Sequence, residues 1–420
     1  MKISIVHTAF GEDGVTSSIR NYIRGLQENH PDIDITLIGE SFHETLPENV
    51  NKDYINWKKG SLVSKLNKKT AKADVIIFEN PLVGIPDERG FTRTKAYKDF
   101  AEQTDKKVIY RIHDLVLDRP KFLKDFTSFF GNFKNACPTT DNVHFLTLTS
   151  TDKERLISAY GMTDTIDVLP DSIIPEDFPY HDYSDKTMSS ERLEGFRGVL
   201  DRDNIAKPTE KLISYPVRVI ARKNIEEALV LTQAINSIGL GPYKLIVTLP
   251  NSREEDYQTS IEHLAEEFNV PCSIGKAYKH IGFDKTKGFT IAELFAISDF
   301  VVTTSIKEGF GYAFIEPALA GRALIGRNIP NVTLDFQKNK MNLNHLYNES
   351  DFPIGKTSFN RLTNAKEILS DESRLKDFAN TLNLENRLIQ AEKNILVNMK
   401  AVTEAYNHRK IAADLYGYLI

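Results

Sequence analysis

Residues 308–321 read Glu-Gly-Phe-Gly-Tyr-Ala-Phe-Ile-Glu-Pro-Ala-Leu-Ala-Gly. The apolar run Phe300–Thr304 before them predicts a buried strand, and the apolar residues within them predict a helix, so this stretch is a turn from a strand into a helix. Gly309 and Gly311 allow the turn to adopt a positive φ or to approach a ligand closely. Pro317 is typical of the first turn of a helix, where its missing N–H costs nothing.

The ends of this stretch predict a binding site for a phosphorylated sugar. A helix that begins near Glu316 would direct its free N–H groups and the positive end of its dipole at a ligand, and both favour a diphosphate. Glu308 and Glu316 stand on either side of the turn, with seven residues between them. Each carboxylate can accept hydrogen bonds from two neighbouring hydroxyls of a sugar or a ribose.

The same alternation of short apolar strands and helical patterns extends in both directions along the chain and predicts parallel α/β sheets. In the first half the predicted strands are Lys2–His7, Asp34–Ile38, Asp74–Phe78, Lys107–His113, Val143–Thr149 and Ile166–Leu169. In the second half they are Lys211–Tyr215, Tyr243–Leu249 and Phe300–Thr304, and a long helical stretch from about Arg374 to Tyr418 ends the chain.

A break in this alternation divides the chain. Residues 176–208 are rich in Asp, Ser, Arg and Pro without a sustained period, which indicates an inter-domain connection with a short helix near Glu191–Val199. The predicted domains are therefore 1–175 and 209–390, followed by a C-terminal helix over 391–420.

Composition excludes several classes of protein. A chain of 420 residues is too long for one ordinary core, and 41% hydrophobic with 26% charged residues is typical of a soluble enzyme. The net charge of -5 gives no sign of a nucleic-acid partner. The cysteines, Cys137 and Cys272, are far apart, which fits a reducing cytoplasm. No run approaches the roughly 20 apolar residues of a membrane span.

Residues 308–321 resemble the glutamate-seven-residues-glutamate motif of retaining GT-B glycosyltransferases, especially those of family 4, with Pro317 where that family usually has Ala. Asp299–Ser305 resembles the family's strand before the first Glu. Arg218 and Lys223 have the five-residue spacing of the family's diphosphate-binding pair, although Val217 replaces the usual Gly. Arg222 is a competing candidate for the cationic role.

The resemblance is looser in the first half. Gly11-Glu12-Asp13-Gly14-Val15 resembles the family's glycine loop after the first strand, with Gly14 near the donor phosphates. His113 ends a predicted strand, as does the family's cleft-facing His. Val168–Ser172 resembles a segment that usually reads apolar-Pro-Asn-Gly, with Asp171 and Ser172 substituted.

The resemblance implies a GT-B fold: two Rossmann-like domains that face each other across a cleft, with the C-terminal helix crossing back to the first domain. It implies a retaining, metal-independent hexosyl transfer from a nucleotide-diphosphate sugar, without a cofactor, to a sugar, small-molecule, lipid or protein acceptor. The implied catalytic residues are Arg218, Lys223, Glu308 and His113. The implied donor-binding residues are Glu316, Gly309, Phe310, Gly311 and Gly14.

Other functions stay open at this point. The same fold serves sugar-nucleotide epimerases and phosphorylases, and a glycosyltransferase-like chain can also support a catalytic partner without being an enzyme. One cluster of lysines indicates either a solvated helix or weak contact with an anionic membrane surface. Its members are Lys58, Lys59, Lys65, Lys68, Lys69 and Lys72.

Overall fold

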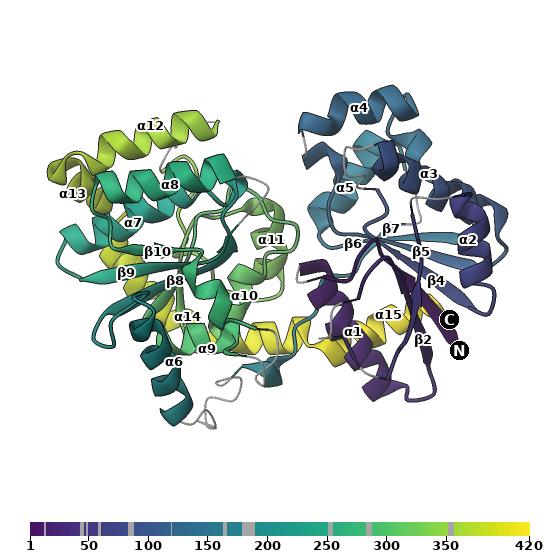
Figure 1. Ribbon diagram of the computed structural model, residues 1–420, viewed down its shortest axis with the longest axis horizontal. Coiled ribbons are helices and arrows are strands. Elements are labelled where there is room, and N and C mark those ends of the chain that lie inside the picture. Colours follow the sequence, from purple (N-terminus) through teal and green to yellow (C-terminus); the bar gives the residue numbers. More distant parts are fainter. Residues whose placement is uncertain are drawn as a thin grey trace. The chain divides into compact units, whose positions relative to one another are not determined.

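Two parallel sheets organise the chain, one in each of two units (Figure 1). The first unit comprises Met1–Ile174 and Tyr406–Ile420, and the second comprises Pro175–Ala405. The computed structural model describes residues 1–11, 14–42, 46–47, 49–57, 60–82, 88–118, 120–162, 166–178, 190–250, 255–282, 288–351 and 357–420.

The first sheet has the strand order β3-β2-β1-β4-β5-β6-β7, with every neighbouring pair parallel. Its strands are β1 (Lys2–Val6), β2 (Asp34–Gly39), β3 (Asn51–Tyr54), β4 (Val75–Glu79), β5 (Lys107–Ile112), β6 (Val143–Thr147) and β7 (Ile166–Val168). All but β3 lie where the alternation predicts a strand. The sequence of β3 is Asn-Lys-Asp-Tyr, and these residues are largely exposed because β3 forms an edge of the sheet.

Helices cover both faces of the first sheet. Successive side chains of a strand point to opposite faces, so apolar strands such as β4 need a packing partner on each face. Along β4, Ile76 and Phe78 face a core that includes residues of α2, α3, α4 and α5, whereas Val75 and Ile77 face α1 and α15. The helices are α1 (Gly14–Asn29), α2 (Leu62–Lys69), α3 (Glu88–Gln103), α4 (Pro120–Phe130), α5 (Ser150–Tyr160) and α15 (His408–Leu419).

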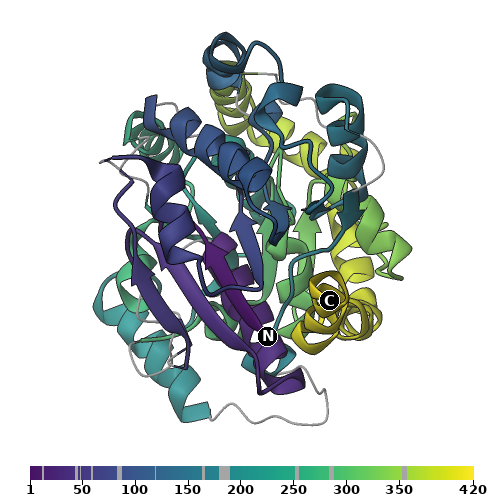
Figure 2. The ribbon, with the colours of Figure 1, turned by 90° about the vertical axis from the view of Figure 1, so that its right-hand side faces the viewer.

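The end of the chain is helical as predicted but is divided into separate helices. These are α13 (Glu372–Thr381), α14 (Leu384–Tyr406) and α15, and α15 belongs to the first unit. Asn407 separates the last two helices, and its side chain accepts a hydrogen bond from the backbone N–H of Arg409, as a helix N-cap does. α15 then packs closely on α1, where a Cβ on Gly25 would lie only 2.3 Å from the carbonyl oxygen of His408. The two termini lie near each other in this unit (Figures 1 and 2).

The second sheet has the order β10-β9-β8-β11-β12 and is also parallel. Its strands are β8 (Lys211–Arg218), β9 (Tyr243–Leu249), β10 (Cys272–Ile274), β11 (Phe300–Thr303) and β12 (Ala323–Gly326). The other helices of this unit are α6 (Ser190–Arg202), α7 (Ile225–Ser237), α8 (Glu255–Glu267), α9 (Ile291–Ile297), α10 (Tyr312–Leu319), α11 (Pro330–Lys338) and α12 (Ser358–Leu369).

The segment predicted as an inter-domain connection contributes to the core of the second unit. Helix α6 lies within residues 176–208, close to the short helix expected there. Phe196 and Leu200 of α6 are fully buried and pack with Leu212 of β8 and Leu294 of α9. This unit therefore begins at Pro175 and includes the whole described part of the polar segment.

Candidate active site

The candidate site of the second unit lies where β8 and β11 end, at the carboxyl edge of the sheet. These strands are neighbours, and parallel α/β sheets bind ligands beyond the carboxyl ends of such strands. A short 3₁₀ turn, η4 (Ala221–Lys223), follows β8, and the loop 304–311 connects β11 to α10.

Lys223 and Glu308 form the centre of this site. The ammonium of Lys223 donates a hydrogen bond to Glu308 Oε1, and Arg222 Nη1 lies 3.4 Å from Glu308 Oε2. The backbone of Glu308 is held as well, because Asn331 Nδ2 donates to its carbonyl over 3.1 Å. The structure thus brings together two residues that the sequence predicts for the site and adds Arg222.

Glu308 is ionised in this setting although it is buried. Burial by itself would raise the pKa of its carboxyl group, but the positive charges of Lys223 and Arg222, together with hydrogen bonds from Lys223 and Ser305, lower that pKa. The site therefore holds one buried carboxylate beside two cations, which leaves a net positive charge for an anionic ligand.

Tyr215 connects the two loops that carry these charges. Its hydroxyl, fully buried on β8, donates to the carbonyl of Lys223 over 2.7 Å and lies 3.0 Å from Ser305 Oγ. The backbone N–H of Thr304 donates to the same hydroxyl over 3.2 Å. The position of Lys223 relative to Glu308 is therefore fixed from inside the sheet.

The start of α7 is fixed by two buried ion pairs. Glu227 accepts from Arg327 Nη2 over 2.6 Å and from the Tyr347 hydroxyl over 2.7 Å. Glu226 accepts from Arg361 Nε over 2.7 Å, and Arg361 Nη2 also donates to the carbonyl of Ala221 in η4. These contacts hold the backbone on both sides of Lys223.

Helix α10 begins four residues earlier than the sequence predicts. Its first residue is Tyr312, so Pro317 lies inside the helix and not in its first turn, and Glu316 lies one turn beyond the start. The reason is Gly311, which takes the N-cap position with a φ of 94°, a conformation that favours glycine. The first N–H groups of α10 therefore follow the turn at Gly311 directly, beside Glu308.

The remaining residues predicted in this segment take different positions. The side chain of Phe310 is 5% exposed and packs edge-on against Phe336, so only its backbone is available to a ligand. Gly309 and Glu316 are partly exposed. Arg218 is exposed at the end of β8, after a register shift between Tyr215 and Arg218, and is not part of the Lys223–Glu308 cluster.

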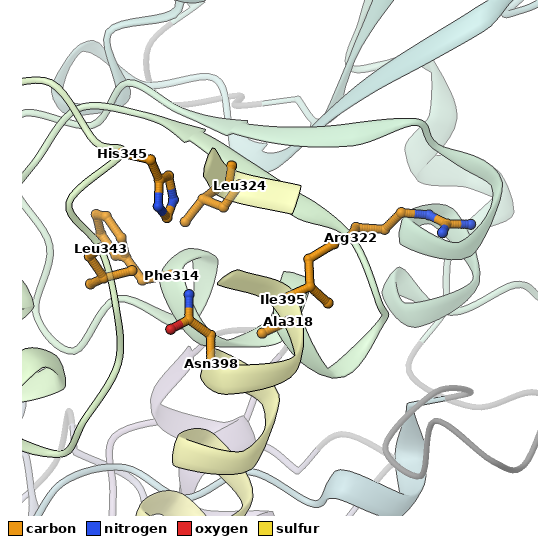
Figure 3. A pocket seen from close by; sticks show the side chains of 9 residues that line it. Phe314, Ala318, Arg322, Leu324, Leu343, His345, Ile395 and Asn398 are labelled. Carbon is orange, nitrogen blue, oxygen red and sulfur yellow. The ribbon is translucent and has the colours of Figure 1, made fainter. Parts of the chain in front are cut away.

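A small pocket lies behind α10, and its lining explains how that helix is supported (Figure 3). Phe314 and Ala318 of α10 meet Leu324 of β12 and Ile395 of α14 there. His345 also lines the pocket, and burial lowers its pKa to about 4, so it is neutral near pH 7. The pocket has room for roughly one water molecule and is a packing defect, not a substrate site.

A second cluster of charges lies at the carboxyl edge of the first sheet, around His113. Nε2 of His113 lies 2.6 Å from Glu79 Oε2, and Nδ1 lies 3.7 Å from Asp171 Oδ1. Arg111 Nη2 donates to the same Asp171 oxygen over 2.8 Å. All four side chains are buried. The sequence predicts a cleft-facing His113, and the structure places both of its ring nitrogens opposite carboxylates.

Polar residues of α1 complete this cluster. Ser18 Oγ donates to Asp171 Oδ1 over 2.5 Å, and the Tyr22 hydroxyl donates to Glu79 Oε1 over 2.7 Å. The two carboxylates balance Arg111 and a protonated His113, so the cluster is neutral as a whole. It ties the ends of β4 and β5 and the residues after β7 to α1.

We expect His113 to stay protonated well above neutral pH. Burial alone would lower its pKa, but Asp171 and Glu79 raise the pKa to about 9. The stabilisation from this charge is then complete below the ordinary pKa of about 6.5 and is lost as the pH rises through about 9. Imidazole NMR shifts, with the His113→Gln variant to assign the signal, measure this directly. Titration at or below pH 6.5 would contradict it.

Gly14 is the first residue of α1 and is exposed. A Cβ at this position would meet no atom within 4 Å, so packing within the protein does not require glycine at this position. Glu12 and Asp13 of the predicted glycine loop lie outside the described residues. The structure therefore leaves the predicted contact of Gly14 with the donor as a prediction.

The lysine cluster is only partly described, since Lys58 and Lys59 lie outside the described residues. Lys69 pairs with Asp53, and Lys65 donates to the carbonyl of Asn56. Lys68 and Lys72 are exposed. Within the part of the chain that the structure describes, every helix is too short or too polar to span a bilayer.

Several groups of these clusters were missed by sequence reasoning, and three of them show what signal the sequence offered. Glu79 ends the otherwise apolar strand Val-Ile-Ile-Phe-Glu, and a charge at that position is a usable signal. Asp171 stands where the resembling segment usually has Asn. Tyr215 gave no signal, because its hydroxyl partners lie up to 90 residues away in the sequence.

Comparisons with known proteins agree on the fold. No family model matches the chain. A mannosylglucosyl-3-phosphoglycerate synthase of Petrotoga mobilis is 25% identical over 362 residues, which cover 80% of this chain. The match spans 66% of that relative's length.

Solved structures extend the similarity to the whole chain. The Anabaena protein HepE in complex with UDP has a TM-score of 0.66 at 13% identity, covering 100% of this chain and 99% of that one. A UDP-forming α,α-trehalose-phosphate synthase from Burkholderia xenovorans, in complex with glucose-6-phosphate, has a TM-score of 0.63 at 11% identity and covers 100% of both chains. The fold of this chain is therefore the one that these two proteins share.

Proposed function

We propose that this chain, which has the GT-B fold of its structural relatives, is a retaining glycosyltransferase that uses a nucleotide-diphosphate sugar as donor. The observation that carries the proposal is the convergence of Lys223 and Arg222 on Glu308, beside the start of α10. Cations, the positive end of the α10 dipole and one ionised carboxylate together suit a diphosphate that is joined to a sugar.

The main barrier of this reaction is the departure of the nucleoside diphosphate. The bond between the anomeric carbon and the β-phosphate oxygen breaks, and its electron pair stays on the nucleoside diphosphate. The acceptor hydroxyl attacks the anomeric carbon from the same face, its oxygen forms the new glycosidic bond, and its proton passes to an oxygen of the departing diphosphate. Because negative charge grows on the diphosphate in the transition state, a fixed ammonium such as that of Lys223 stabilises that state more than the bound donor.

The other side chains bind the donor in this proposal. Glu308 holds Lys223 in place and accepts hydrogen bonds from sugar hydroxyls, and Glu316 accepts from the ribose. The backbone of Gly309, Phe310 and Gly311 lies along the sugar and the diphosphate. Arg218 reaches the diphosphate from the end of β8, as the family resemblance implies. His113 keeps the catalytic role that the family resemblance implies, and it does so as a cation.

The proposal includes no metal ion and no cofactor, because Lys223, Arg218 or Arg222, and the dipole of α10 supply the positive charge. We expect release of nucleoside diphosphate from a nucleotide sugar to proceed at full rate in excess EDTA.

A panel of nucleotide sugars, screened first by thermal shift, identifies the donor, since a ligand at 100 times its Kd stabilises the folded state by roughly 2.7 kcal/mol.

The outcomes of this experiment separate the alternatives. Activity that disappears in EDTA and returns with manganese would contradict the metal-independent mechanism. Conversion of the sugar within an intact nucleotide sugar would instead identify an epimerase. Binding without any turnover, in the presence of a broad acceptor panel, would favour a chain that supports a catalytic partner.

A further inference from the structure

Arg93 in the first unit is a buried cation that has no partner among the residues that the structure describes. It lies on α3 and is 8% exposed. Within the described part of the chain it makes no hydrogen bond and no ion pair. Burial of an unpaired charge is costly, and Arg side chains buried to this degree are normally paired. A site that keeps such a cation is suited to an anion that arrives from outside.

Tyr97 adds a second free donor one helical turn further along α3. It is 4% exposed, and its hydroxyl has no hydrogen-bond partner. Arg93 and Tyr97 are four residues apart on α3, so their side chains lie on the same face of the helix. Burial raises the pKa of this phenol, while Arg93 and Thr8 lower it. Among the described residues, a guanidinium and a phenol that lack acceptors thus lie close together.

The place of this pair in the fold is where parallel sheets bind ligands. From β1 the chain continues to β2 on one side and later returns to β4 on the other, so β1 and β4 flank the topological switch point. Thr8 follows β1 by two residues. The hydroxyl of Thr94, next to Arg93, donates to the carbonyl of Pro81 just after β4 over 2.9 Å. This bond holds the Arg93 region of α3 at the switch point.

Neighbouring aromatic residues fix the pair. The indole of Trp57 packs edge-on against Tyr97, with ring centroids 5.8 Å apart, and donates to the carbonyl of Thr8 over 3.2 Å. Phe78 of β4 also packs against Tyr97, with ring centroids 4.5 Å apart. The site is therefore rigid on the sides that the structure describes, and its donors are oriented before a ligand binds.

We propose that Arg93 and Tyr97 bind the anionic group, a phosphate or a carboxylate, of the acceptor substrate in the first unit. The inference rests on the proposed function and narrows the acceptor to an anionic class. The planar fork of Arg93 fits two oxygens of either group. Tyr97 donates to the third oxygen of a phosphate, or to one of the two oxygens of a carboxylate.

The test uses the full-length chain and compares ligands that differ only in the group at one carbon. Glucose 6-phosphate, glucuronate and glucose are titrated by calorimetry, and inorganic phosphate is tested by thermal shift. We expect the wild type to prefer one of the two anions to glucose. Arg93→Met should lose about 10-fold to 100-fold of that preference, as for a lost hydrogen bond to a charged group. Arg93→Lys, which keeps the charge without the fork, should be intermediate.

Two controls make the result specific to this site. Lys95→Met removes an exposed cation that pairs with Asp99 on the same helix, and it should keep the wild-type preference. Lys223→Met disables the donor site of the second unit and should also keep it. An anion preference that is lost only in Lys223→Met would place the anion at the donor site, which overturns the role of Arg93 and leaves the proposed glycosyl transfer intact.

Stability provides an independent test. Because Arg93 has no partner within the described ranges, Arg93→Met should leave the melting temperature of the ligand-free chain unchanged or raise it. A fall of several degrees would show that Arg93 is structural and would overturn the proposal. So would a wild type that binds glucose, glucose 6-phosphate and glucuronate equally.

Discussion

Replacing Lys223 with methionine should lower turnover about 100-fold to 1000-fold, the range seen when one preorganised donor to a developing anion is removed. Lys223 is 9% exposed and is fixed through its own backbone as well as through Glu308. The loss should appear mainly in kcat and less in KM for the donor, because the diphosphate gains charge only as the glycosidic bond breaks.

Steady-state kinetics at saturating donor measure this effect. Lys338→Met is a suitable control, since that lysine is 64% exposed and pairs with Asp335 on α11. The thermal unfolding of Lys223→Met must also be recorded, because the change removes one of the two cations beside Glu308. A well-folded variant with normal turnover would show that the diphosphate is bound elsewhere.

The same kinetics decide which arginine assists Lys223. The family spacing predicts Arg218, whereas the contacts in the structure favour Arg222, which reaches Glu308. A large loss in Arg218→Ala with a small one in Arg222→Ala would support the register from the resemblance. The reverse result would mean that the bulge in β8 before Arg218 has moved the cationic position to η4.

The strand-to-helix segment could be predicted from the sequence because its signals are local. An apolar run, a pair of glycines and an apolar helical pattern are all contained in Phe300–Gly321, and they place β11, the turn and α10 in the right order. The predicted start of α10 is too late in the chain, because Pro317 indicates a first turn but is also tolerated inside this helix. The conformation of Gly311 decides where the helix begins.

Short strands were the part of the fold that local patterns did not reveal. β10 and β12 have three and four residues, too few to establish a period of two, and β3 is polar because it forms an edge. Their position follows from pairing with strands that the sequence does predict. Tertiary context, not propensity, selects such segments.

The buried clusters were predicted least well, since each joins residues that are distant along the chain. His113 was predicted as a site residue, but its partners Glu79 and Asp171 come from other strand ends, 34 residues before it and 58 after it. The same holds for the ion pairs at the start of α7. Their functional importance can be seen only once the sheet has brought them together.

Arg327→Met should destabilise the second unit by about 3–5 kcal/mol, the cost of leaving a buried charge without its partner. Arg327 is 3% exposed, and Glu227 is 1% exposed, and they lie 2.6 Å apart. Of the described residues that bond this carboxylate, the neutral donors Tyr347 and Asn224 would remain. Lys366→Met is the matched control, because its ion pair with Glu267 is about half exposed and such pairs contribute roughly 0–1 kcal/mol.

The pH dependence of this loss identifies its cause. Burial already raises the pKa of Glu227, and Arg327 opposes that rise. Without Arg327 the pKa must rise further, so the folded variant takes up a proton that the unfolded chain releases above its ordinary pKa of about 4.3. The difference in the free energy of unfolding between wild type and variant should therefore be largest at pH 8 and become smaller toward pH 4. Urea unfolding across this range measures it, and Arg327→Met combined with Glu227→Gln should recover most of the stability. A difference that is independent of pH, or a double variant as unstable as the single one, would show that Arg327 acts through packing and not through its charge.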